Sequence, residues 1–169
     1  MAFDMRMARE SEVTTDMLEL RKKGVFSNEY LAEENGTVVA ELSRSSWRAQ
    51  GEITVEGHRL KLKKHGALKD TFALYYGDAK VVEVTQPRAL QSRLVFTHEG
   101  KDYEIRNKAW YSSTMIVESA GNVVGSVRPR GIFATGAVVE LSDSLPLVLR
   151  VLIGWIAMVR WEEAAAAAS

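Results

Sequence analysis

The chain has 169 residues, which is enough for one domain with a substantial core and marginal for two. It carries 22 basic and 22 acidic side chains, so its formal net charge is zero and no global field recruits nucleic acid or repels a membrane. Cysteine is absent, which excludes disulfides, thiolate metal sites and cysteine nucleophiles, and fits a reducing compartment.

Residues 1–13 contain scattered charges and no apolar run of the kind found in signal peptides. We therefore expect no secretory signal and a cytoplasmic protein. A glycosylation sequon occurs at Asn35-Gly36-Thr37, but without secretion this stretch is better interpreted as a turn. We assign residues 1–16 to an N-terminal arm and residues 17–161 to a single domain.

Short runs in which apolar and polar residues alternate dominate the chain from Met17 onward. Glycine or asparagine interrupts these runs every eight to twelve positions, as antiparallel sheet requires. Asn35-Gly36 is the strongest hairpin signal, because both residues tolerate positive φ. The pattern predicts about twelve strands, at residues 18–21, 30–33, 38–43, 52–56, 59–63, 72–76, 82–84, 94–96, 103–105, 110–118, 123–128 and 132–141.

Residues 145–161, LPLVLRVLIGWIAMVRW, are apolar on every face when wound as a helix, so the helix they predict must be enclosed. Asp143 or Ser144 is the expected cap, and Pro146 is expected in the first turn, giving a helix over residues 144–161. A transmembrane anchor is the competing interpretation. Spanning a bilayer takes about 20 apolar residues, and Arg150 and Arg160 bracket only nine, which favours a buried core helix.

The strands and the helix fit one architecture. A large antiparallel sheet must curl, and closing it removes its edges. Eight strands already make an interior that side chains just fill, so a twelve-stranded barrel has room for a helix about 10 Å across. We therefore predict a mainly β fold, a roughly twelve-stranded antiparallel closed barrel around a central hydrophobic C-terminal α-helix.

The order of hairpins and the terminal helix resemble the Tubby C-terminal-like superfamily, in its phospholipid scramblase and LURP-one-related branch. The similarity covers most of residues 17–161 and is carried by residues 103–106, 112–117 and 121–127 and by the helix from Leu145. The resemblance implies a barrel with a central helix. It also implies association with phosphoinositides or membranes, lipid scrambling or signalling.

Two features depart from the scramblase pattern. The cysteine-rich palmitoylation stretch is missing, and the region that corresponds to the acidic calcium loop, residues 137–143, offers only Glu140 and Asp143. Because calcium takes six or more oxygen ligands, these two carboxylates do not make a calcium site. Calcium-activated scrambling is therefore not expected.

No catalytic or cofactor motif is present. His58, His65 and His98 lack the spacing of a zinc-binding helix, and no nucleophile elbow, P-loop or dinucleotide fingerprint occurs. Glu33 and Glu34 are better interpreted as a solvated loop than as an acid and base pair. We expect a non-enzymatic protein with no catalytic residues, no metal site and no cofactor.

One basic segment is a candidate site. In His58 to Lys64 the leucines point to one face of a strand, and Arg59, Lys61 and Lys63 point to the other. These three cations, joined by Lys64, form a ridge that could bind anionic lipid headgroups. An ordinary solvated strand face is the favoured alternative, because Glu52 and Glu56 on the preceding strand could neutralise the ridge.

Arg150 is a candidate contact at the mouth of the barrel, where its guanidinium meets water or a carboxylate. A ligand contact inside a partly filled barrel is the alternative. Trp155 and Trp161 are expected to pack, with Trp161 near the rim. Residues 162–169 have high helix propensity but contain nothing that requires burial, so we expect a frayed extension or mobile tail.

Three functional hypotheses follow. The first is a non-enzymatic binding or scaffold module, cytoplasmic or peripheral at the inner membrane surface. Its partner would be an anionic phospholipid, a phosphoinositide or a protein, and no nucleic acid is expected. The second is a membrane protein anchored by its C-terminal helix. The third is a carrier of a small apolar ligand, which requires that the helix leave the barrel interior vacant. The oligomeric state is left open.

Overall fold

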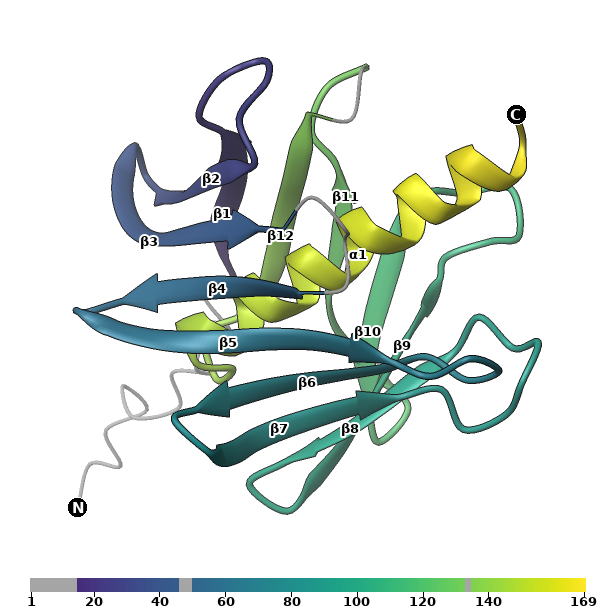
Figure 1. Ribbon diagram of the computed structural model, residues 1–169. Coiled ribbons are helices and arrows are strands. Elements are labelled where there is room, and N and C mark those ends of the chain that lie inside the picture. Colours follow the sequence, from purple (N-terminus) through teal and green to yellow (C-terminus); the bar gives the residue numbers. More distant parts are fainter. Residues whose placement is uncertain (1–14, 46–49, 133–134) are drawn as a thin grey trace, which may run out of the picture.

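The computed structural model describes residues 15–45, 50–132 and 135–169, which form twelve strands and one helix (Figure 1). The predicted arm at residues 1–16 lies almost wholly outside the described residues. The strands are β1 (Thr15–Lys22), β2 (Glu29–Glu34), β3 (Thr37–Arg44), β4 (Gln50–Val55), β5 (His58–His65), β6 (Thr71–Tyr76), β7 (Ala79–Thr85), β8 (Leu94–His98), β9 (Lys101–Asn107), β10 (Met115–Ser119), β11 (Asn122–Pro129) and β12 (Gly136–Ser142). The helix is α1 (Leu147–Ala167).

The strands form a closed antiparallel barrel in which each strand pairs with its neighbours in sequence. β12 returns to pair with β1, in a register that runs from Thr15 opposite Ser142 to Arg21 opposite Gly136. The weakest seam of the barrel lies between β7 and β8, where the register joins only Thr85 and Val95. The predicted closed, twelve-stranded barrel is confirmed.

The central helix fills the barrel. Every residue from Leu149 to Val159 is buried, and the Trp155 ring meets the Phe72 ring edge to face at a centroid distance of 5.7 Å. Figure 1 shows α1 running through the space that the strands surround, with the C terminus emerging from it. The predicted central helix is confirmed. No helix in the described part of the chain is long and apolar enough to cross a bilayer.

The helix differs from the prediction at both ends. It begins at Leu147 rather than 144, and Pro146 is its N-cap with no side-chain capping hydrogen bond. The expected cap is wrong, because Ser144 instead hydrogen bonds with Ser142 through its hydroxyl and its backbone N–H. At the other end the helix continues to Ala167, so most of the expected tail is helical.

Two strands are shorter than predicted. β10 starts at Met115, and residues 108–114 form a loop instead of continuing the strand to Trp110. β12 starts at Gly136, so Ile132 lies in a turn. A Cβ at Gly136 would lie 1.8 Å from the carbonyl oxygen of Leu20, which explains why only glycine fits where β12 meets β1.

The two ends of the barrel are built differently. At one end, here called the hairpin end, the strands are joined by two-residue turns at 35–36, 56–57, 77–78, 99–100 and 120–121, and residues 143–146 lead into the helix. Asn35 and Gly36 have φ of 51° and 78°, which confirms the predicted hairpin. At the other end, the loop end, longer connections span residues 23–28, 45–49, 66–70, 86–93, 108–114 and 130–135. The helix C terminus emerges among these loops.

Candidate functional site

Charge is divided between the two ends of the barrel. In the described residues of the loop-end connections, six side chains are basic (Lys23, Lys69, Arg88, Arg93, Lys108 and Arg130) and one is acidic (Asp70). The described connections of the hairpin end carry four acidic side chains (Glu56, Asp78, Glu99 and Asp143) and none that are basic. In a chain with no net charge, the connections at the two ends of the barrel therefore differ in sign of charge.

Half of the loop-end basic side chains have a carboxylate partner. Lys23 contacts Glu29 at 3.2 Å, Arg93 contacts Glu104 at 3.1 Å, and Arg130 contacts Glu19 at 3.1 Å. The hydrogen bond and charge of Glu29 raise the pKa of Lys23. Lys69, Arg88 and Lys108 are exposed, and none of them forms an ion pair with any residue that the structure describes. These three charges face solvent without local neutralisation.

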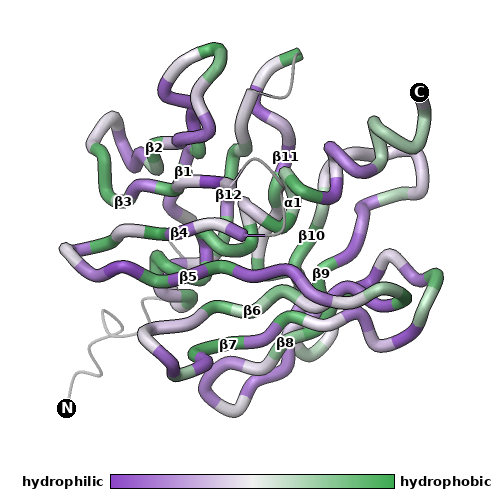
Figure 2. Tube along the Cα trace, in the orientation of Figure 1, coloured by the Kyte–Doolittle hydropathy of each residue, from purple (hydrophilic) through white to green (hydrophobic). Residues whose placement is uncertain are grey.

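The most exposed apolar side chains lie at the same end. Seven large apolar residues are at least 77% exposed: Val25, Phe26, Leu68, Leu90, Trp110, Tyr111 and Ile132. All seven belong to loop-end connections. The other exposed large apolar residues of the described chain, on β1, β3, β6, β7 and β11, are 46–60% exposed. Figure 2 shows hydrophobic colouring at the tips of the β1–β2 and β11–β12 loops.

Grooves open between these loops. A groove of about 920 Å³ between the β7–β8 and β9–β10 loops is lined by Leu90, Arg93, Arg106, Lys108 and Trp110, among others. A hydrogen bond with Glu118 raises the pKa of Arg106 there. A second groove, of about 500 Å³, lies between the β9–β10 loop and the helix, where Trp161 donates a hydrogen bond to the carbonyl oxygen of Ser113 (2.7 Å).

An ion-pair collar holds the emerging helix in the mouth of the barrel. Arg44 of β3 binds Glu162 through two hydrogen bonds, of 2.7 and 2.9 Å. Lys64 of β5 pairs with Glu163 and, at 3.3 Å, with Asp70, which also contacts Arg160 at 3.1 Å. These contacts explain why the helix extends past Trp161, since they fix its last turns to two strands.

The predicted basic ridge is present in part. Arg59 and Lys61 are exposed on the outer face of β5, and the Lys63 ammonium lies 5.3 Å from the Tyr75 ring centroid. Glu52 lies opposite Lys61 in the register and 3.9 Å from Arg59, so the expected neutralising carboxylate is in place.

Lys64 does not belong to the ridge. It shares the inward side of β5 with Leu60 and Leu62, and its ammonium lies 5.7 Å from the centroid of the Phe72 ring. The prediction that Lys64 extends the ridge is wrong, because successive side chains of a strand point to opposite faces. The ridge therefore consists of Arg59, Lys61 and Lys63.

Arg150 sits at the hairpin end, nearly buried, where it meets a carboxylate. Its Nη1 donates to Oε1 of Glu34 at 2.5 Å, and its Nε donates to the carbonyl oxygen of Leu145 at 3.1 Å. These bonds tie the first turns of the helix to the end of β2. The alternative of a ligand contact finds no support here, since the surrounding helix residues pack against the barrel wall.

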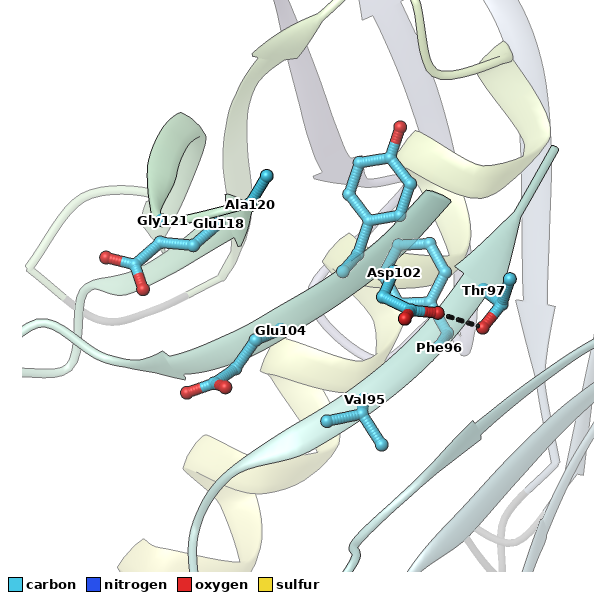
Figure 3. A pocket seen from close by; sticks show the side chains of 9 residues that line it. Val95, Phe96, Thr97, Asp102, Glu104, Glu118, Ala120 and Gly121 are labelled. Atoms are coloured by element: carbon cyan, nitrogen blue, oxygen red, sulfur yellow. Dashed lines mark hydrogen bonds between the residues drawn. The ribbon is translucent and has the colours of Figure 1, made fainter. Parts of the chain in front are cut away.

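A further cavity, of about 550 Å³, lies on the flank of the barrel beside β8, β9 and the β10–β11 turn. Asp102, Glu104 and Glu118 line it, and Figure 3 shows the hydrogen bond from Thr97 to Asp102 (2.7 Å). Arg93 and Arg106 bind the other two carboxylates, at 3.1 and 2.8 Å. Within the described ranges no group of three or more His, Asp or Glu residues is arranged to hold a metal ion.

The three histidines lie apart. His58 contacts the Tyr76 hydroxyl at 3.1 Å, His98 lies 3.9 Å from Glu99, and His65 ends β5. Among the described residues of the flank cavity and the loop end, no constellation of nucleophile, base and orienting group is evident. The exposed cations and apolar side chains make the loop end the candidate functional site, as a binding surface.

Sequence reasoning missed this surface. Arg59, Lys61, Lys63 and Lys64 stand close together in the sequence, whereas the loop-end residues are spread over more than 100 positions. The signal that could have identified them is the repeated occurrence of a basic residue beside an apolar one in every second connection. Models of protein families, curated proteins and solved structures were compared with the chain, and none matched. The assignment to the Tubby-like superfamily therefore stays a prediction.

Proposed function

We propose that this protein is a non-enzymatic binding module that docks through its loop end on an anionic phospholipid surface. The observation that carries the proposal is the separation of charge, with six basic residues and one acidic residue in the described loop-end connections against four acidic residues and none basic at the hairpin end. Close to a negative surface each exposed Lys or Arg contributes about 1 kcal/mol. The acidic hairpin end points away from the same surface, so the polarity also orients the protein.

Phospholipid fits this surface better than nucleic acid does. A duplex phosphate backbone is bound by cationic grooves or stripes, and such a contact would leave exposed aliphatic side chains of the loop end, such as Leu68, Leu90 and Ile132, in water. Anionic lipids give the cytoplasmic leaflet of a membrane its negative surface potential. In this proposal the protein is cytoplasmic and peripheral there, in agreement with the membrane association that the Tubby-like resemblance implies.

The two other hypotheses need arrangements unlike this one. An anchored protein would have to withdraw residues 149–159 of the helix from the barrel, which exposes the apolar wall around them. A carrier of an apolar ligand needs a vacant interior, and the helix occupies it. Docking through the loop end requires no change in the position of the helix.

Vesicle sedimentation with two matched triple variants tests the proposal. The first, Lys69→Gln with Arg88→Gln and Lys108→Gln, removes the three unpaired loop-end charges. The second, Arg59→Gln with Lys61→Gln and Lys63→Gln, removes the same charge from the side of the barrel. Binding to vesicles of phosphatidylcholine mixed with phosphatidylserine should weaken about 100-fold for the first triple and little for the second.

Three results would contradict the proposal. The unmodified protein could bind neutral and anionic vesicles equally well, or it could bind neither kind of vesicle. The loop-end triple could bind as tightly as the unmodified protein. The side-of-barrel triple could lose binding instead, and that result would transfer the site to the predicted ridge. Repeating the first measurement with a phosphoinositide in place of phosphatidylserine shows whether the headgroup matters beyond its charge.

A further inference from the structure

Each apolar loop tip carries its own basic residue. In five loop-end connections a described, exposed apolar residue lies within three positions of a basic one: Phe26 follows Lys23, Leu68 precedes Lys69, Leu90 follows Arg88, Trp110 follows Lys108, and Ile132 follows Arg130. An interfacial membrane site has the same composition, with cations at the level of the phosphates and apolar or aromatic groups below them. The pattern repeats on five separate connections of one end.

The backbone at Leu90 has an unusual conformation. Leu90 is fully exposed and has φ of 68°, a conformation that bulky side chains rarely adopt. The four other non-glycine residues with positive φ among the described residues all lie in two-residue hairpin turns. Leu90 is thus the one residue of this kind at the loop end of the described chain.

A buried glutamine ties two of the tip-bearing loops together. The side-chain oxygen of Gln86 accepts a hydrogen bond from the backbone N–H of Asp70 (3.0 Å), and its amide nitrogen donates to the carbonyl oxygen of Gln91. Asp70 ends the loop that bears Leu68, and Gln91 follows Leu90. The loop that bears Leu68 and the loop that bears Leu90 are therefore linked by hydrogen bonds through Gln86.

We infer that the apolar loop tips insert into the hydrocarbon region of the bilayer, so that the barrel stands on the membrane by its loop end with the helix C terminus facing the lipid. This inference rests on the proposed function and goes beyond it, because electrostatic docking alone requires no penetration. A bilayer suits these residues better than a protein partner does. A fluid surface closes around each tip separately, whereas a protein interface would need the tips to form a continuous packed patch.

Insertion changes how binding responds to salt. Attraction between exposed charges is screened as ionic strength rises, but burial of apolar side chains is not screened. Binding should therefore weaken with salt to a residual level rather than disappear. Leu68→Ser and Ile132→Ser should each weaken binding by about tenfold without changing its salt dependence. The charge-removing triple at Lys69, Arg88 and Lys108 should reduce the salt dependence.

The absence of cysteine from the chain permits a direct test of depth. Spin labels are attached to single-cysteine variants at four tips, Phe26→Cys, Leu68→Cys, Leu90→Cys and Ile132→Cys. Control labels are attached through Val38→Cys and Val123→Cys, two exposed apolar positions next to hairpin-end turns. With anionic vesicles the tip labels should become accessible to oxygen and protected from a water-soluble nickel complex, while the control labels stay in water.

The results separate the two proposals. If the protein sediments with anionic vesicles while all four tip labels stay accessible to nickel, docking stands and insertion is wrong. If no vesicle is bound, docking fails and insertion fails with it. If the tip labels become protected without vesicles as protein concentration rises, the tips contact a second copy of the chain, and insertion is again wrong. Circular dichroism of each variant checks that the barrel is intact.

Discussion

The guanidinium of Arg44 on β3 donates hydrogen bonds to both carboxylate oxygens of Glu162. Glu162 lies 118 positions later, on the part of the helix that leaves the barrel. Burial by itself would lower the pKa of Arg44, but the hydrogen bonds and charge of Glu162, together with Tyr30, outweigh it and raise the pKa. Glu162 thus stabilises the charged form of the buried arginine. This contact joins the wall of the barrel to the end of its core.

Glu162→Ala should destabilise the protein, because it leaves the buried Arg44 without its two-point acceptor. The expected loss in free energy of unfolding is about 1–3 kcal/mol. Urea denaturation measures it. Glu99→Ala is the control, since Glu99 lies in a two-residue turn, is exposed, and its one ionic contact among the described residues is with His98 at 3.9 Å. A loss no larger than that of the control would mean that the collar contributes nothing to stability.

The architecture could be predicted from local patterns. Alternating residues indicate strands, Asn35-Gly36 indicates a tight turn, and a helix that is apolar on every face must be enclosed. The high helix propensity of residues 162–169 allowed for an extension, but the attachment of this extension to the barrel through Glu162 and Glu163 could not be predicted in this way, because nothing in the tail requires burial. Its partners, Arg44 and Lys64, are about 100 positions away and are brought near only by closure of the barrel.

The candidate site was harder to predict for a related reason. Arg59, Lys61 and Lys63 lie within seven consecutive residues, so the ridge can be recognised in the sequence. The loop-end surface is instead made of one basic and one apolar residue from each of several connections. In an antiparallel barrel every second connection lies at the same end. Comparing alternate connections of the predicted strands would therefore have shown that the basic and apolar residues share one end. Strand alternation would also have placed Lys64 inside, with Leu60 and Leu62.

Arg150→Leu should destabilise the protein more than the double variant Arg150→Leu with Glu34→Leu. Removing the arginine alone leaves the largely buried Glu34 carboxylate without its cation and should cost about 3 kcal/mol. Removing both charges avoids that penalty and should recover at least about 1 kcal/mol. Urea denaturation of the single and double variants gives the coupling energy. If the two substitutions are additive, the ion pair is not energetically coupled.

Gly154→Ala should reduce stability even though alanine is the better helix former by about 1 kcal/mol. A Cβ at this position would lie 2.5 Å from Cδ1 of Leu20 and 2.9 Å from Cγ2 of Val139, so both wall side chains must move. Overpacking of this kind costs about 1–3 kcal/mol, and Gly154→Val should cost more than Gly154→Ala. Thermal denaturation ranks the variants. A melting temperature for Gly154→Ala above that of the unmodified protein would show that the helix can shift within the barrel.

Gln86→Ala should weaken vesicle binding without removing any charge or apolar tip. The substitution deletes the side-chain bridge between the Leu68 and Leu90 loops but keeps the hydrogen bond from the Gln86 backbone N–H to the carbonyl oxygen of Asp70 (2.9 Å). The looser loops must become ordered when the protein docks. If this ordering costs about 1.4 kcal/mol of binding free energy, the affinity should fall by a factor of about ten. Hydrogen exchange should quicken in residues 66–70 and 86–93, with the β1–β2 loop as an internal control. If exchange quickens while affinity is unchanged, the bracing of these two loops is irrelevant to docking.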